Sequence, residues 1–227
     1  MFHIILLRYN RTNPAIIAYS IYLYFNSRSY RCTSKSLEYV IKRSHVSIWK
    51  WVQKNASLAD HFRVYKHKVK EIFVDETLIQ IDGKDYWLWI AYEPNVQRCL
   101  MMHISRERTI FVCYQFFKQL RSRFGRKPIL TDWGTWYYQA CRWLGLKHRI
   151  YEAALKNKME RFVQKIKDRT ECFDHHFPCR KTACNRLHVY NWLKLCILYI
   201  HTDMDKARFM EFLMDGGWKL TQPQFSW

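Results

Sequence analysis

The chain has 227 residues and a mass of 28.0 kDa, and its 38 Lys and Arg against 19 Asp and Glu give a formal net charge of +19 at pH 7. Hydrophobic residues make up 49% of the chain and aromatic residues 17%, whereas there are only 6 Gly and 5 Pro. This composition excludes a disordered, collagen-like or linker-dominated chain, and the charge excludes an ordinary neutral housekeeping domain. The length is typical of one or two domains that need no disulfides to hold a core.

The positive charge is concentrated in the first third of the chain. Residues 1–70 hold 13 basic and 2 acidic side chains, a net charge of +11, and the remaining residues carry +8. A polyanion is the natural partner, and nucleic acid fits better than a membrane because no lipidation motif or polybasic anchor accompanies the charge. A solvated basic surface without a partner is the alternative.

The apolar stretches 15–25 and 192–200 are shorter than the 20 or so residues that span a bilayer. The apolar residues 1–7 lack a basic leader and a cleavage site, so no signal peptide is expected and the predicted location is the cytoplasm. Cysteines in such a reducing compartment are buried thiols or metal ligands. There are eight, at positions 32, 99, 113, 141, 172, 179, 184 and 196.

The first 60 residues are predicted to be all-helical. Pro14 begins a helix over residues 15–26, and Thr33 or Ser34 caps a second helix that runs to about residue 42. Ser44 caps a third helix over residues 45–55, after a turn of only two or three residues. This spacing predicts a helix-turn-helix domain over residues 1–60, followed by a basic linker over residues 61–70.

After the linker the hydrophobic pattern changes to that of strands. Asp82-Gly83 is suited to a tight hairpin turn between strands 71–81 and 84–93. The later elements are, in order, strand 97–105, helix 107–123, strand 127–131, helix 134–144, strand 147–151 and helix 157–170. We therefore expect an α/β fold, a mixed five-stranded sheet with flanking helices over residues 71–172, and a Cys- and His-containing loop with a helical tail over residues 173–227.

Three carboxylates stand out in so basic a chain. Asp75 lies between apolar residues of a strand, Asp132 ends a buried strand, and Glu160 lies on a basic helix. Carboxylates on adjoining elements can hold two Mg²⁺ ions, or Mn²⁺ in their place, for in-line phosphoryl transfer. Taken singly, Asp132 could instead be a helix cap and Glu160 a partner in surface ion pairs.

Five segments together resemble the motif series of DDE transposases of the IS6/IS240 type, particularly archaeal versions. They are Val74-Asp75-Glu76-Thr77, Tyr86-Trp87-Leu88-Trp89, Leu130-Thr131-Asp132, Leu146-Lys147-His148-Arg149 and Asn157-Lys158-Met159-Glu160-Arg161. The resemblance implies an RNase H-like fold in which Asp75, Asp132 and Glu160 are the catalytic, metal-binding triad. It also implies DNA contacts by Asn157, Arg161 and Lys167. The segment 133–135 departs from the family's small or Pro-containing segment.

The third predicted helix is a candidate for DNA recognition. Its residues Ile48, Trp49 and Val52 are spaced to face a helical core. Ser47, Lys50 and Gln53 would then face DNA, where Lys50 can meet a phosphate or a guanine edge. The segment 44–53 also resembles the family's end-binding helix, which implies recognition of terminal inverted repeats. The alternative is an ordinary solvent-exposed helix surface.

A cysteine- and histidine-rich segment follows the last predicted catalytic helix. Four of its side chains could bind zinc: Cys172, His175, Cys179 and Cys184. Their spacing is not that of a standard zinc finger, so we favour thiols packed under a basic loop in which Arg180 and Lys181 touch DNA. Trp87 and Trp89 are expected in the core and not in base stacking.

The predicted function is therefore that of a prokaryotic, nucleoid-associated DDE transposase. It would bind the ends of an insertion sequence as a homodimer on double-stranded DNA, with no membrane association. It would then catalyse strand cleavage and transfer of the freed 3′-OH to a target. One alternative is a catalytically inactive or domesticated copy of such a transposase, which acts as a DNA-binding regulator at the ends of the element. Another is an RNase H-like nuclease for hybrids or junctions, which would not need the helix-turn-helix.

Overall fold

A computed structural model describes residues 12–27, 29–59, 64–151, 153–170 and 186–214. The chain divides into two compact units. We call residues 1–60 with 187–227 the helical unit and residues 61–186 the sheet unit, and each is described by itself.

The sheet unit is built on five strands in the order β3-β2-β1-β4-β5. They are β1 (Ile72–Ile81), β2 (Lys84–Glu93), β3 (Arg98–Ser105), β4 (Ile129–Thr131) and β5 (His148–Ile150). The first three strands are antiparallel, β4 runs parallel to β1, and β5 runs parallel to β4. Asp82 and Gly83 have φ angles of 53° and 69°, the positive values that a tight hairpin turn requires. The expected mixed five-stranded sheet with flanking helices, preceded by a helical region, is confirmed.

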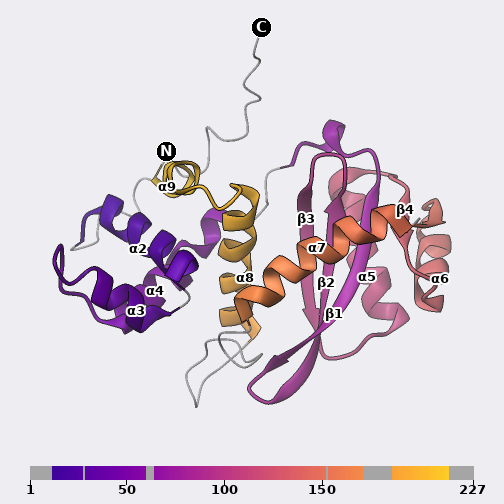
Figure 1. Cartoon of the computed structure of the whole chain (residues 1–227). Coiled ribbons are helices and arrows are strands. Elements are labelled where there is room, and N and C mark those ends of the chain that lie inside the picture. The colour runs from indigo at the N-terminus through magenta and orange to yellow at the C-terminus, as the bar shows by residue number, and fades with distance from the viewer. Residues whose placement is uncertain (1–11, 28, 60–63, 152, 171–185, 215–227) are drawn as a thin grey trace, which may run out of the picture. The chain divides into compact units, whose positions relative to one another are not determined.

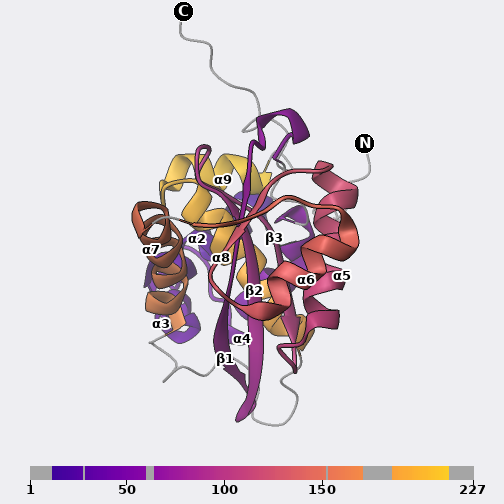
Figure 2. The same cartoon turned by 90° about the vertical axis from the view of Figure 1, so that its right-hand side faces the viewer.

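Helices cover both faces of this sheet. Helix α7 (Ala153–Thr170) lies across one face, and α5 (Ile110–Phe124) and α6 (Thr135–Leu144) lie against the other, as Figures 1 and 2 show. Successive residues of a strand point to opposite faces. Accordingly Ile72 and Val74 of β1 belong to the core shared with α5 and α6. Phe73 and Asp75, which alternate with them in β1, point to the α7 side.

The α7 side of the sheet has its own aromatic contacts. Tyr92 of β2 pairs with Phe73 in the strand register. The Tyr92 ring lies 4.9 Å from the ring of Phe162 in α7, centroid to centroid. On the other face Trp89 is fully buried and donates a hydrogen bond of 2.8 Å to Ser105, so its predicted place in the core is confirmed.

The described part of the helical unit contains α2 (Pro14–Ser27), α3 (Tyr30–Ser36), α4 (His45–Asn55), α8 (Arg186–His201) and α9 (Lys206–Met214). A 3₁₀ turn at Ala56–Ala59 follows α4, and another at Lys66–Lys68 precedes the sheet. Pro14 begins α2 and Ser44 caps α4, both as predicted. In the part of the chain that the structure describes, no helix is both long and apolar enough to cross a membrane.

The predicted second helix is wrong at both ends. Its cap is Ser29, whose hydroxyl accepts a hydrogen bond from the Cys32 backbone, and it ends at Ser36. Thr33 lies inside α3 and donates its hydroxyl to the Ser29 carbonyl at 2.8 Å, whereas Ser34 donates to the Arg43 carbonyl at 2.6 Å. Residues 37–44 therefore separate α3 from α4, and the predicted two- or three-residue turn is also wrong.

The C-terminal helices complete the core of the helical unit. Trp192 of α8 donates a hydrogen bond of 2.7 Å to the Tyr24 hydroxyl in α2. The ring centroid of Phe25 lies 5.8 Å from that of Tyr199 in α8 and 6.1 Å from that of Phe209 in α9. These contacts join residues that are more than 160 positions apart in the sequence, so helices α8 and α9 pack with α2 and not as a separate tail.

Candidate active site

Strand register brings two of the three predicted catalytic carboxylates side by side. Asp75 lies near the middle of β1, the central strand, and Asp132 directly follows β4. Phe73 pairs with Leu130 in the parallel register, Asp75 and Asp132 lie two positions further along the chain, and the charge of Asp132 acts on Asp75. Glu160 lies on α7, the helix that covers the same face of the sheet.

The charges of these three residues act on one another. The pKa of Asp75 is raised, first because the carboxyl is buried and then because the negative charges of Asp132 and Glu160 oppose its ionisation. Two contacts oppose this rise: a hydrogen bond of 3.0 Å from the backbone of Glu76, and the positive charge of Lys156. Asp75 therefore lies near enough to the other two carboxylates to feel both of their charges.

The carboxylates are not gathered into a ready ligand sphere. Within the described ranges, no three His, Cys, Asp or Glu side chains lie close enough to hold one metal ion. The side chain of Glu160 is 55% exposed and lies 3.6 Å from the ammonium of Lys156 on the preceding turn of α7. The arrangement is thus an open one in which Glu160 is paired with a lysine.

The loop after β4 holds Asp132 in a fixed orientation. Its Oδ1 accepts a hydrogen bond of 2.9 Å from the backbone N–H of Gly134. Thr131 donates its hydroxyl to the Asp132 carbonyl at 2.8 Å and contacts Nε2 of His148 at the same distance. Burial lowers the pKa of His148 although the Asp132 charge opposes this. These contacts connect the Asp132 backbone to the edge strand β5.

Tyr151 is a site residue that the sequence analysis missed. It follows β5, and its ring stacks on Phe73 with centroids 6.0 Å apart. Burial raises the pKa of its phenol, and the charges of Asp75, Asp132 and Glu160 raise it further. The phenol therefore stays protonated at neutral pH. Its position at the end of the predicted strand 147–151 was the one feature of the sequence that could have pointed to a place in the site.

Glu76, next in sequence to Asp75, points to the α5 and α6 side of the sheet and was also missed. Its side chain is only 3% exposed and pairs with the Arg108 guanidinium at 3.4 Å. Burial raises the pKa of Glu76 to about 7, the charges of Asp75 and Asp132 add to this, and Arg108 opposes it. The signal in the sequence was a second acidic residue in an apolar strand.

Helix α7 carries the predicted DNA contacts Asn157, Arg161 and Lys167, all exposed. The opposite side of the helix is buried through Met159, Phe162 and Ile166. The helix therefore packs on the sheet with its apolar side and presents a basic side to solvent.

The other predicted DNA contacts lie on α4, in the helical unit. Lys50 is exposed and Ser47 is half-buried. Gln53, by contrast, donates a hydrogen bond of 3.2 Å to the His188 carbonyl and accepts one of 3.2 Å from Asn191, both in α8. These bonds give Gln53 a role in packing within the unit.

The predicted core face of α4 is partly wrong. Ile48 and Val52 are fully buried as expected, but the third buried apolar residue is Trp51 and not Trp49. Trp49 is half-buried, with its ring 5.1 Å from that of His188. This contact brings α8, a helix distant in sequence, against the flank of α4.

The proposed zinc ligands Cys172, His175, Cys179 and Cys184 lie outside the described residues, as do Arg180 and Lys181. Four of the remaining cysteines are buried: Cys99, Cys113, Cys141 and Cys196. Burial raises the pKa of Cys141 to about 12 and raises those of Cys99 and Cys113 as well. These three are packing residues and not reactive thiolates.

The chain is similar to a relative of known sequence and to several solved structures. The uncharacterized protein MJ0017 of Methanocaldococcus jannaschii is 29% identical over 150 residues, which span 60% of this chain and 69% of that protein. Among solved structures, the catalytic core domain of BIV integrase has a TM-score of 0.43 at 17% identity, covering 57% of this chain and 82% of its own. The catalytic core domain of HTLV-2 integrase in complex with magnesium, in its dimeric form, has a TM-score of 0.40 at 17% identity, covering 56% and 85%.

Residues 69–190, more than half of the chain, match the DDE_Tnp_IS240 family, a DDE domain. This match includes all five strands and each of the three carboxylates of the site. The chain therefore belongs to the DDE_Tnp_IS240 family.

Proposed function

We propose that this protein is a transposase that binds the ends of an insertion sequence, cleaves one strand at each end and transfers the freed 3′-OH to target DNA. Membership of a DDE family supports phosphoryl transfer on DNA as the general activity. The observation that carries the proposal is that Asp132 and Glu160, from two other elements, lie near enough to Asp75 for their charges to raise its pKa. Matched carboxylates on several elements are the usual signature of such a site.

Asp75, Asp132 and Glu160 would hold two Mg²⁺ ions, for which Mn²⁺ can substitute. Carboxylate oxygens are the ligands that these ions prefer, and a cation would offset both the burial and the repulsion between carboxylates that raise the pKa of Asp75. Glu160 is exposed, so it can leave Lys156 and turn toward the two aspartates. When bound, the ions activate the attacking oxygen and stabilise the leaving oxygen.

No protein nucleophile is needed for this reaction. Tyr151 bears a hydroxyl near the carboxylates, and the rise in its pKa, caused by burial and by their charges, keeps it a phenol and not a phenolate. A protonated phenol is a poor nucleophile but a good hydrogen-bond donor. We assign Tyr151 to donating a hydrogen bond within the site.

The surface beside Asp132 suits a DNA strand. Trp133, the next residue, is 82% exposed, and Tyr138 on the first turns of α6 is 60% exposed. Lys147 and Arg149, on either side of His148, are exposed as well. Aromatic side chains stack on bases and basic ones meet phosphates. We propose that Trp133 stacks on a base or sugar of the DNA end near the cleaved bond.

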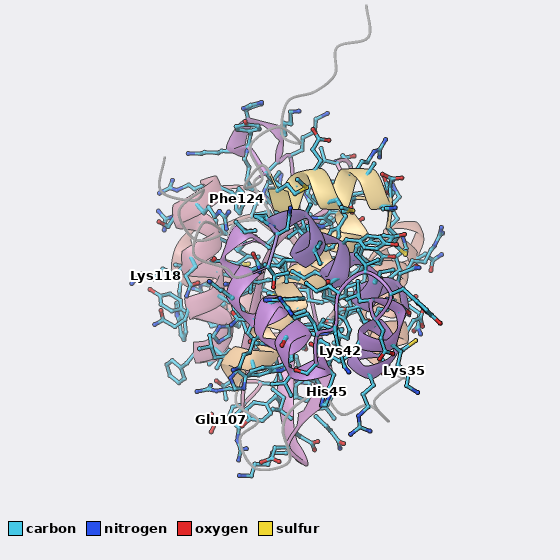
Figure 3. The ribbon with its side chains drawn as sticks, turned by 90° about the vertical axis from the view of Figure 1, so that its left-hand side faces the viewer. Lys35, Lys42, His45, Glu107, Lys118 and Phe124 are labelled. Carbon is cyan, nitrogen blue, oxygen red and sulfur yellow. The ribbon has the colours of Figure 1, made fainter. Side chains whose placement is uncertain are left out.

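On the helical unit, Lys50 and Ser47 of α4 are the proposed contacts to the terminal inverted repeats. Figure 3 shows Lys42 and His45 near the start of α4 and Lys35 on α3, and all three side chains are exposed. They can supply phosphate contacts beside Lys50. Because two DNA ends must be joined, we propose a homodimer as the active assembly.

The test is an end-cleavage assay on labelled duplexes from the DNA that flanks the gene. We expect specific binding to these ends and nicking that requires Mg²⁺ and is absent in Asp132→Ala, whose binding is unchanged. Equal binding without nicking in both proteins would favour the regulatory alternative. Cleavage of RNA–DNA hybrids or junctions in preference to the ends would favour the nuclease.

A further inference from the structure

A single arginine joins four segments of the sheet unit on the face opposite the carboxylates. Arg108, just before α5, lies between the rings of Trp87 in β2 and Trp136 in α6, with its guanidinium carbon 4.3 and 4.6 Å from their centroids. Its Nη1 also lies 3.4 Å from Oε1 of Glu76 in β1. The guanidinium is thus held by two aromatic faces and one carboxylate.

Glu76 and Trp136, which Arg108 contacts, are each connected to one of the two aspartates of the site. Glu76 follows Asp75 in β1, and its backbone N–H donates a hydrogen bond of 3.0 Å to Asp75. Trp136 packs so closely on Gly134 that a Cβ there would lie 2.8 Å from the indole ring. Gly134 in turn donates its backbone N–H to Asp132 at 2.9 Å. Asp75 therefore accepts a hydrogen bond from Glu76, which Arg108 contacts directly. Asp132 accepts one from Gly134, which packs against the Trp136 ring that Arg108 contacts.

We infer that Arg108 is a positioning residue that fixes the separation of the Asp75 and Asp132 carboxylates by holding Glu76 and Trp136 at a set distance. This inference rests on the function proposed above, in which the two carboxylates bind the same metal ions. A lysine cannot replace the arginine, because only a planar guanidinium can stack between two rings and pair with a carboxylate at once.

The surroundings of Glu76 explain why Arg108 cannot be lost without consequence. Three buried polar atoms of this region have no hydrogen-bond partner among the described residues: Oε2 of Glu76, Nε1 of Trp136 and the Tyr137 hydroxyl. Without Arg108 the buried Glu76 carboxylate would also lose its ion pair, and Trp136 would lose the cation that it stacks on. Both neighbours of the aspartates would then be free to shift.

The test compares Arg108→Lys with Arg106→Lys. Arg106 is a matched control because it is exposed, as Arg108 is, and also lies over an aromatic ring, that of Tyr86 at 5.1 Å, but it contacts neither Glu76 nor Trp136 in any described interaction. Mn²⁺ binding is measured by the electron paramagnetic resonance signal of free Mn²⁺, and DNA joining is measured separately. Thermal unfolding verifies that each variant is folded.

We expect Arg108→Lys to need about tenfold more Mn²⁺ for half-saturation, because residues that orient metal ligands typically change affinity by this order. Its joining activity should recover in part at high Mn²⁺, whereas Arg106→Lys should match the wild type in both measurements. A merely structural role would lower the unfolding temperature without moving the Mn²⁺ titration.

A second variant covers the case in which Arg108→Lys does not fold. Trp136→Phe keeps an aromatic ring but loses part of its contact with Arg108 and Gly134, and we expect a smaller shift of the Mn²⁺ titration in the same direction. Unchanged Mn²⁺ binding in the folded variants, beside an active wild type, would overturn this inference alone. A wild type that neither binds Mn²⁺ nor joins DNA would overturn the proposed function and this inference with it.

Discussion

Asp75 and Glu76 are consecutive residues of β1 whose side chains lie on opposite faces of the sheet. Asp75 responds to the charges of Asp132 and Glu160 on the α7 side. Glu76 is held by Arg108 on the α5 and α6 side. The strand therefore carries the candidate metal ligand on one face and the residue that steadies it on the other, and both acidic side chains have raised pKa values.

The raised pKa of Glu76 predicts a pH-dependent stability of the metal-free protein. Its pKa rises from 4.5 to about 7 on folding, so the folded state holds this proton more tightly than the unfolded state does. The contribution of Glu76 to stability is complete below pH 4.5 and is lost as the pH rises to about 7. Relative to wild type, Glu76→Gln should gain up to about 1.4 kcal/mol per pH unit in this interval. Urea unfolding in chelator at several pH values measures the difference, and parallel curves for the two proteins would contradict it.

The raised pKa of Asp75 predicts that metal binding strengthens with pH. Burial and the charges of Asp132 and Glu160 favour the protonated carboxyl, and a proton competes with a cation for the same oxygens. Mn²⁺ affinity should therefore increase as the pH rises through the raised pKa of Asp75, and Asp75→Asn should lose both the affinity and its pH dependence. Calorimetric titration over a series of pH values measures this. The same pH dependence in Asp75→Asn as in the wild type would exclude Asp75 as a ligand.

Trp133 is predicted to contact DNA. Loss of one stacking contact costs about 1–3 kcal/mol, so Trp133→Ala should bind labelled DNA ends roughly tenfold more weakly. The control is Trp143→Ala, which removes a tryptophan that is 51% exposed but whose ring contacts Phe111 and Tyr114. Fluorescence anisotropy measures both variants. Equal losses in the two, or none in Trp133→Ala, would remove Trp133 from the DNA surface.

Lys50 and Gln53 are predicted to behave differently although they lie on the same helix. Lys50→Ala should weaken binding to the DNA ends and reduce the slope of log affinity against log salt concentration by about one, as expected for the loss of one phosphate contact. Gln53→Ala should mainly reduce stability, by about 1–2 kcal/mol, because it breaks two hydrogen bonds to α8. Lys118→Ala, at an exposed position of α5, serves as the charge control. Normal stability with lost sequence preference in Gln53→Ala would restore the prediction that this residue reads DNA.

Glu93 is predicted to stabilise the start of β1. The fully buried carboxylate accepts hydrogen bonds of 3.1 Å from the backbone N–H groups of Lys70 and Glu71. It also accepts two from Asn95, at 3.1 and 2.8 Å. Glu93→Gln should lower the free energy of unfolding by about 3 kcal/mol, because an amide nitrogen would replace one accepting oxygen. Urea unfolding measures the loss, and a change below about 0.5 kcal/mol would show that the network is dispensable.

The strands of the sheet could be predicted from the sequence because they depend on local patterns. Alternation with period two and the Asp82-Gly83 turn fix β1 and β2 to within one residue. The catalytic role of the three carboxylates came from the family resemblance and stays a prediction.

The features that the sequence did not reveal depend on distant residues. Trp49 and Gln53 are engaged because α8 reaches α4 from more than 130 positions away. The role of Arg108 requires rings from β2 and α6 to meet it. The cap at Ser29 was misplaced because several hydroxyl residues compete in the segment 27–36 and only the packed helices select one of them.

The central claim is that Asp75, Asp132 and Glu160 form one catalytic set. It is tested by strand transfer from a DNA end with a preformed 3′-OH to a supercoiled target, in Mg²⁺ and in Mn²⁺. The variants are Asp75→Asn, Asp132→Asn and Glu160→Gln, with Glu107→Gln as the matched control at an exposed position. We predict that each of the first three abolishes joining while end binding persists, and that the control joins like the wild type. Joining at wild-type rates by any of the three would contradict the account.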